Sequence, residues 1–320
     1  MSITKLSFAS IALAVVACGP KAPVSTDTGA TPLTVHTWTS SDAGFHTHSH
    51  WVDTGREVVV FDAQFTPELA QELVADIQAT TDSPIATVVV THPNPDKFLG
   101  APVFQALGAE VVASEATAAA LPGVHAYKKA FFVGAGAFTE DSFPALPSID
   151  RTFEDELVLD TAVPVRLVEL DHSGVTSNQT VAIAGDHLFA GDLTAGRTHA
   201  WLEGAIIDGA AQPDLEAWQA ALDELAELGD ERSLLHPGRG ETLPLARAVE
   251  EQKAYLASAN TIVADYVAGL DAPFEALTGA ESGAHYDAIT AAVAAEWPQL
   301  DHAYLVRYGV YGLALSEASK

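Results

Sequence analysis

Cysteine, methionine and basic residues are scarce in this chain of 320 residues, which has one Cys, one Met and 15 Lys and Arg against 43 Asp and Glu. The resulting net charge of −28 argues against a nucleic-acid partner, because the phosphate backbone would repel so acidic a surface. It also disfavours attraction to anionic lipid head groups. The acidity mostly indicates a soluble surface that repels other copies of the chain.

The amino terminus is typical of a secretory signal. Lys5 precedes an apolar run at residues 6–17, which is too short to span a bilayer as a permanent helix. The run ends in Val-Val-Ala-Cys-Gly, which resembles the bacterial lipobox, in which the Cys is lipidated and becomes the first residue of the mature protein. We therefore expect a signal at residues 1–18, a lipid anchor at Cys18, a linker at residues 19–32 and a location on the bacterial cell envelope. The alternative is that Cys18 is an ordinary buried thiol.

With its only Cys at the anchor, the mature chain has no disulfides and no thiolate metal ligands. Residues 33–257 alternate strand and helix patterns and are long enough for one large α/β domain, and residues 258–320 read as a helical extension packed on it. Strands are expected at 33–38, 45–52, 58–61, 85–90, 110–113, 157–159, 163–170, 178–184, 187–190 and 233–235. Helices are expected at 66–80, 98–107, 115–121, 213–228, 243–257, 261–270, 286–297 and 304–317. Residues 123–149 have no assignable pattern and are a candidate insertion over the site.

A polar loop follows the buried strand at residues 85–90, at the edge where α/β sheets commonly place their sites. It reads Thr-His-Pro-Asn-Pro-Asp-Lys, and its two prolines stiffen the backbone. Its candidate ligand-binding residues are His92, Asn94, Asp96 and Lys97. The simpler alternative is a polar strand-to-helix loop in which the Asp caps the helix.

Three later segments carry further candidates. His172 ends another apolar strand in Asp-His-Ser-Gly, and Asp192 closes Phe-Ala-Gly-Asp. Arg239 lies in His-Pro-Gly-Arg-Gly, after the strand at 233–235. In addition, the alternating segment 45–52 puts three histidines on one strand face, where they would either bind a metal or form a hydrated surface near the mouth of the site. These three are His46, His48 and His50.

Taken in order, these motifs resemble those of the metallo-β-lactamase fold superfamily. The first is similar to Thr-His-x-His-x-Asp-His, with Asn94 and Lys97 at two ligand positions, and the last is similar to Pro-Gly-His-Gly, with Arg239 where a ligand His would be. His236 is a candidate substitute ligand on the other side of the Pro-Gly pair. Asp62, at the end of the strand 58–61, matches an Asp that lies behind the metal loop. The resemblance implies a four-layer αβ/βα sandwich with the site at one edge of two facing sheets.

The resemblance also assigns metal ligands. The first metal would be held by His92, Asn94 and His172, with Asp192 as the bridging residue. The second position would combine Asp96 and Asp192 with Lys97 and Arg239, and neither an ammonium nor a guanidinium has a lone pair to donate. We therefore expect one divalent metal, zinc, and the loss of the second site.

Two functions follow from this resemblance. The first is metal-dependent hydrolysis of a small ester, lactone or phosphodiester, in which Asp96 orients or deprotonates the attacking water. Lys97 and Arg239 would then bind an anionic group or stabilise a developing oxyanion. The second is a non-catalytic binding module, in which these cations pair with Asp96 and Asp192. The two cations have a physical reason in either case, because two carboxylates that lose their metal repel each other unless positive charge replaces it. This pattern favours a site rebuilt around one metal, or around none, over a ruined site.

Overall fold

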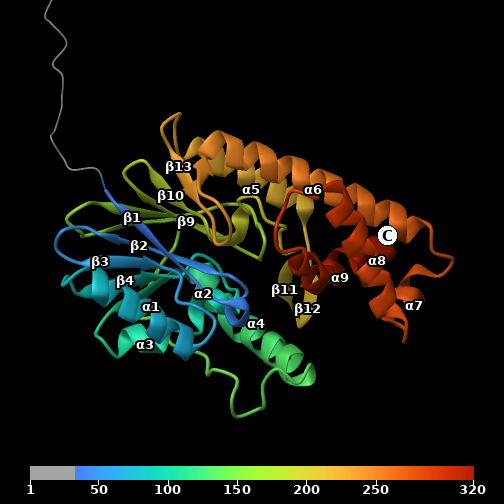
Figure 1. The fold of residues 1–320 in the computed structure, drawn as a ribbon, viewed down its shortest axis with the longest axis horizontal. Coiled ribbons are helices and arrows are strands. Elements are labelled where there is room, and N and C mark those ends of the chain that lie inside the picture. Colours follow the sequence, from blue (N-terminus) through green and yellow to red (C-terminus); the bar gives the residue numbers. More distant parts are fainter. Residues whose placement is uncertain (1–32) are drawn as a thin grey trace, which may run out of the picture. The chain divides into compact units, whose positions relative to one another are not determined.

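Two six-stranded sheets face each other in the computed structural model, which describes residues 33–320 (Figure 1). The expected signal, the anchor at Cys18 and the linker at 19–32 lie outside the described residues. The described part, Leu33–Lys320, is one compact unit. No helix within it is both long and apolar enough to cross a bilayer.

The first sheet has the strand order β1-β2-β3-β4-β5-β6, and β3 to β6 are parallel. Its central strand β3 is buried along its whole length, as expected for a run of Val-Val-Val-Phe between two layers. The strands are β1 (Val35–Thr39), β2 (His48–Asp53), β3 (Val58–Phe61), β4 (Ile85–Val89), β5 (Glu110–Ser114) and β6 (Arg151–Phe153).

The second sheet has the order β14-β13-β10-β9-β8-β7, and its only parallel pair is β10 with β13. Two short strands, β11 and β12, form a separate ribbon. The strands are β7 (Glu156–Leu159), β8 (Val165–Glu169), β9 (Thr180–Ala184), β10 (His187–Phe189), β11 (Ala205–Ile207), β12 (Ala210–Gln212), β13 (Leu234–His236) and β14 (Leu243–Pro244).

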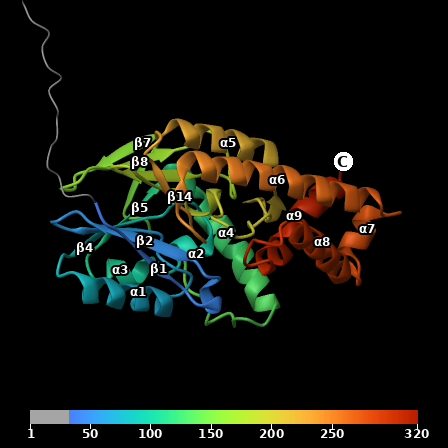
Figure 2. The same ribbon diagram turned by 45° about the horizontal axis from the view of Figure 1, so that its top comes forward.

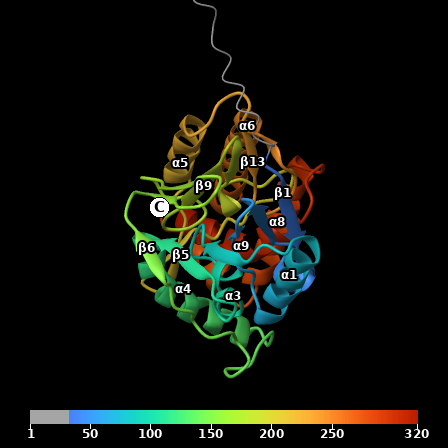
Figure 3. The same ribbon diagram turned by 90° about the vertical axis from the view of Figure 1, so that its left-hand side faces the viewer.

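Helices cover the outer face of each sheet, which completes four layers (Figures 2 and 3). On the first sheet lie α1 (Pro67–Thr80), which Thr66 caps, and α3 (Ala101–Gln105). On the second lie α5 (Leu215–Glu227) and α6 (Leu245–Ala268). Between the sheets is an apolar core in which the rings of Phe61 and Phe189 stack with centroids 3.9 Å apart. The expected αβ/βα sandwich is thus confirmed.

Some elements differ from the expectation. Helix α4 (Glu115–Gly134) continues beyond residue 121 into the unassigned segment, because Leu121, Val124, Lys128 and Phe132 recur at helical spacing and are buried. Helix α6 is one helix where two were expected. The strand expected at 45–52 begins only at His48, because Phe45 and His46 have φ values of 61° and 54°.

The carboxyl-terminal extension packs beside α6 and consists of α7 (Pro273–Thr278), α8 (Ser282–Glu296) and α9 (Tyr304–Ala318). Helix α9 approaches the backbone of residues 202–203 closely: a Cβ added at Gly312 would lie 2.3 Å from the carbonyl oxygen of Glu203. A Cβ at Gly309 would lie 2.6 Å from the amide nitrogen of Leu202. Any side chain at these two positions would push α9 away from the backbone of residues 202–203.

Candidate functional site

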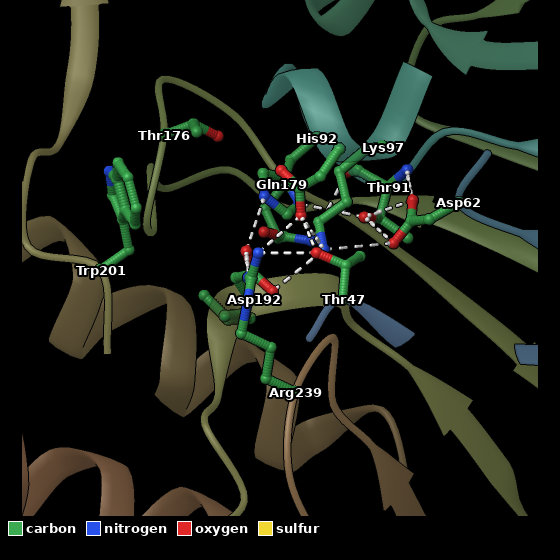
Figure 4. A network of polar contacts seen from close by, with 12 residues as sticks. Thr47, Asp62, Thr91, His92, Lys97, Thr176, Gln179, Asp192, Trp201 and Arg239 are labelled. Atoms are coloured by element: carbon green, nitrogen blue, oxygen red, sulfur yellow. Dashed lines mark hydrogen bonds and ion pairs between the residues drawn. The ribbon is translucent and has the colours of Figure 1, made fainter. Parts of the chain in front are cut away.

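A buried cluster of charged side chains lies where the two sheets meet (Figure 4). Asp96 and Lys97 come from the short helix α2 (Pro95–Phe98), just after β4. Asp192 comes from the 3-10 turn η2 (Gly191–Leu193) after β10, and Arg239 from the loop after β13. The structure thus brings together the four charged residues that the motifs singled out, from three separate segments.

Lys97 is the centre of this cluster and is completely buried. Its Nζ lies 3.0 Å from Asp96 Oδ2, 3.0 Å from Asp192 Oδ1 and 3.9 Å from Asp62 Oδ2. Burial alone would lower the pKa of Lys97, but the carboxylates of Asp192, Asp96 and Asp62 raise it above its ordinary value. The ammonium is therefore charged at every physiological pH.

Arg239 bridges the same two carboxylates from the other side. Its Nη1 donates to Asp192 Oδ2 and its Nη2 donates to Asp96 Oδ2 at 2.9 Å. Further hydrogen bonds run from Nη2 to Thr47 Oγ1 and from Nε to the carbonyl oxygen of Phe45. Burial would raise the pKa of Asp96, but Lys97 and Arg239 hold it well below its usual range. Both carboxylates are thus ionised and neutralised within the protein.

Asp62 lies behind the cluster, and Thr91 links it to His92 by hydrogen bonds. It accepts from the backbone N–H and the hydroxyl of Thr91, each at 2.9 Å. Burial raises the pKa of Asp62 to about 7, although Lys97 opposes this. Because the Thr91 hydroxyl donates to Asp62, we assign the proton of His92 to Nδ1, which lies 2.9 Å from Thr91 Oγ1. Burial lowers the pKa of His92 to about 4, so the ring is neutral.

His92 Nε2 then carries an unprotonated lone pair that faces the cluster. It lies 3.7 Å from Asp192 Oδ2, beyond hydrogen-bond distance, and has no partner among residues 33–320. Asn94, the neighbouring candidate, is buried at the start of α2 and lines the same pocket as Asp96 and Asp192. Of the first-metal ligands expected from the motifs, the structure therefore groups His92, Asn94 and Asp192.

His172 is not part of this group, and its expected placement beside His92 and Asp192 needs correction. Its side chain is 51% exposed, and its Nδ1 pairs with Glu224 of helix α5. The same carboxylate accepts from the backbone N–H of Asp171 at 2.8 Å, which fixes this turn against α5. The partly buried carboxylate of Glu224, and not a buried metal centre, holds this imidazole.

Three other histidines, His46, His50 and His236, make hydrogen bonds that do not involve the charged cluster. His46 is outside β2, where it pairs with Asp42 and hydrogen-bonds to the Tyr304 hydroxyl. His50 is buried and hydrogen-bonds to the carbonyl oxygen of Pro237, so the expected hydrated face is wrong for this residue. Nε2 of His236 lies 3.0 Å from Nδ1 of His187, away from the charged cluster.

The residues of the cluster do not fit a divalent metal. Within residues 33–320 there is no group of three or more His, Cys, Asp or Glu placed to hold one. Both oxygens of Asp192 are already occupied, one by Lys97 and one by Arg239. The Lys97 ammonium lies between Asp96 and Asp192, the two carboxylates on which a cation would have to bind. The ionic contacts that a metal would make are made by two protein side chains.

A narrow pocket opens above the cluster, with a volume of about 20 Å³, which is room for about one water molecule. Its floor includes Asp96, Asp192 and Arg239, and its walls are mainly aromatic. Lys128 of α4 forms one wall, pairs with Glu203 and lies 4.9 Å from the centroid of the Trp201 ring. The aromatic wall residues are Phe45, Phe65, Phe132 and Trp201.

Sequence reasoning missed several residues that shape this site. Thr47, which donates to Asp96 at 2.8 Å, lies in a segment where only the histidines drew attention. Thr91 directly precedes His92 in the first motif. A hydroxyl at this position can hydrogen-bond to the His92 ring, so the sequence did indicate its role. The pair of Lys128 and Glu203 joins α4 to a loop 75 residues later, and no local pattern reveals such a contact.

Comparison with known proteins gives a family match. The model of the metallo-beta-lactamase superfamily matches residues 42–236, which include every residue of the charged cluster except Arg239. No curated protein matches the chain.

Solved structures resemble this fold at low sequence identity. A metallo-beta-lactamase from Pontibacter korlensis has a TM-score of 0.53 and 20% identity, over 71% of this chain and 96% of that one. TMB-1 has a TM-score of 0.52 and 15% identity, over 71% of this chain and 94% of that one. The DIM-1 metallo-beta-lactamase exposed to ceftazidime has a TM-score of 0.51 and 17% identity, over 71% and 93%. At such identities the likeness concerns the fold alone.

Proposed function

This chain belongs to the metallo-beta-lactamase superfamily, and we propose that it is a member that works without a divalent metal, as a non-catalytic binding module. Members of the superfamily are commonly metal-dependent hydrolases, and their metal is often zinc. Here Lys97 and Arg239 provide the positive charge that a metal would otherwise provide between Asp96 and Asp192.

One observation carries this proposal: the Lys97 ammonium is fully buried within 3.9 Å of three carboxylates. A dication beside it would meet strong repulsion, on the order of 8 kcal/mol at 4 Å and an effective dielectric constant of 20. Arg239 would add a similar cost from the opposite side. The carboxylates cannot offset these costs while they also pair with both cations.

A mononuclear hydrolase remains the second candidate, because His92 Nε2 is a buried, unprotonated nitrogen without a partner in the described part of the chain. With Asn94 and Asp192 it would provide at most three donors, and Asp192 would have to release a cation first. The first candidate is favoured because no such rearrangement is needed.

Metal content and hydrolysis together test the proposal. The mature protein, incubated with zinc and then dialysed, should retain substoichiometric metal by elemental analysis and should not hydrolyse generic ester, β-lactam or phosphodiester substrates. The double variant Lys97→His with Arg239→His restores nitrogen donors and should bind zinc. One tightly held zinc per chain in the unmodified protein, with zinc-dependent hydrolysis, would instead establish the second candidate.

We also propose that the chain is tethered to the cell envelope through a lipid at Cys18. The lipobox-like sequence and the linker behind it support this location.

A further inference from the structure

A second, larger cavity lies apart from the charged cluster, between helix α6, the loop 195–198 and the segment that joins α8 to α9. Its volume is about 260 Å³, whereas a cavity of about 150 Å³ in another protein is enough to bind benzene. Much of its wall comes from residues beyond the stretch matched by the family model. Its lining includes Arg197, Thr198, Arg247, Gln252, Tyr255 and Trp297.

Two arginines line this cavity, each beside one carboxylate, and the carboxylate of Glu251 is part of the same lining. Arg197 makes no guanidinium hydrogen bond within the described residues, and its nearest carboxylate, on Glu241, is 3.8 Å away. Arg247 donates from Nε to Glu251 at 2.7 Å, which leaves its terminal amino groups available. In a chain with 43 acidic and 15 basic residues, two such arginines at one cavity indicate a site for a negative group.

The backbone holds Arg197 in an unfavourable conformation. Its φ of 62° lies in the left-handed region, which non-glycine residues seldom adopt outside special sites. Two contacts fix it there: the amide of Asp301 donates to the Arg197 carbonyl, and Gly196 lies tightly against Gly240. A Cβ at Gly240 would lie 1.9 Å from the carbonyl oxygen of Gly196. Strain of this kind is concentrated at binding sites, where it positions a side chain.

Buried polar groups in the same wall add an independent argument. Gln252 is 4% exposed, and its Oε1 accepts from the amide of Ala195 at 3.0 Å, which fixes the carboxamide. Its Nε2 has no hydrogen-bond partner within residues 33–320, and the same holds for Thr198 Oγ1. Since unpaired buried donors are costly, a ligand acceptor within their reach would be stabilised.

Part of the wall is aromatic, and the ring centroids of Tyr255 and Trp297 lie 5.8 Å apart. We propose that this cavity binds a small organic anion: its carboxylate lies between Arg197 and Arg247, and its planar body packs on Tyr255 and Trp297. A planar carboxylate suits the guanidinium fork, and the volume suits a single ring. This site is independent of how the charged cluster works.

Sodium benzoate is a suitable probe, with benzamide and benzylamine as its neutral and cationic counterparts, in titrations of the full mature protein by calorimetry or ligand-observed NMR. Benzoate should bind, and its affinity should exceed that of benzamide by about tenfold or more, as for a hydrogen bond to a charged group. Arg247→Gln should reduce benzoate binding by a similar factor, and Arg197→Gln likewise.

Arg232→Gln is the matched control, because Arg232 is exposed and pairs with Asp186 and Asp230 elsewhere on the surface. It should leave benzoate affinity unchanged. If Arg197→Gln perturbs the strained loop, Arg247→Gln still decides the question, since its position on α6 has ordinary helical geometry. Failure of benzoate to bind, equal affinity for benzamide, or benzoate affinity that Arg247→Gln does not change would each overturn the proposal.

Discussion

Replacing Lys97 by Met should strongly destabilise the folded chain. Met has nearly the volume of the Lys stem, so the change removes the charge with little loss of packing. The ammonium contacts Asp96 and Asp192 at 3.0 Å each, and Arg239 alone would then have to neutralise both. Breaking a buried ion pair by removing one partner typically costs about 3–5 kcal/mol. At roughly 2 °C per kcal/mol for a chain of this size, Tm should fall by about 6–10 °C.

Urea unfolding followed by tryptophan fluorescence, at pH 7.5, measures this loss directly. Lys129→Met is the matched control, because Lys129 is the next residue on α4 after Lys128 and pairs only with the exposed Glu140. Its effect should stay below about 1 kcal/mol. Adding Asp192→Asn to Lys97→Met should recover part of the stability, since it removes a carboxylate left without its cation. If Lys97→Met costs no more than the control, the ammonium does not hold the site together.

The remaining predictions concern other parts of the chain. Cys18→Ala should move the protein from the membrane fraction to the soluble fraction, and unchanged fractionation would contradict the lipid anchor. His172→Ala should leave both thermal stability and metal content unchanged, because the side chain is exposed and pairs with Glu224; a drop in retained zinc would restore it as a ligand. Burial lowers the pKa of His50 to about 3, so below about pH 6.5 the unfolded chain takes up a proton that the folded chain refuses. Stability is therefore lost as pH falls from 6.5, and the His50 contribution to this loss at pH 5 is about 2 kcal/mol. His50→Gln should reduce the difference in unfolding free energy between pH 7 and pH 5 by that amount, and an unchanged difference would show that His50 is protonated in the folded state.

Much of the architecture was predictable from residue patterns. The run at β3 and the cap at Thr66 are local signals, and the motifs at Asp96 and Asp192 follow strand ends, which meet at one sheet edge. The resemblance to a known family therefore gave both the layers and the residues of the cluster. It also suggested that Lys97 and Arg239 would pair with those carboxylates.

The predictions that were wrong have physical causes that cannot be recognised in a local sequence pattern. The alternating histidines predicted a strand, but the left-handed φ at His46 turns the chain before β2 begins. The sequence predicted a short helix ending at residue 121, yet the burial of Phe132 and its neighbours continues α4 across Pro122. His172 follows a strand as a ligand would, but the direction of its side chain depends on Glu224, 52 residues away.

Charge balance explains why the cluster needs two cations and a partly protonated acid. Three carboxylates surround Lys97 and Arg239, so full ionisation would leave one buried negative charge without a counter-charge. Burial raises the pKa of Asp62 to about 7, although Lys97 and the hydrogen bonds from Thr91 lower it. A proton held on Asp62 at and below neutral pH leaves Asp96 and Asp192 matched one to one by Lys97 and Arg239. If only Lys97 or only Arg239 had replaced a metal ligand, one of the two carboxylates would have no counter-charge. The two cations are therefore one joint replacement for a dication.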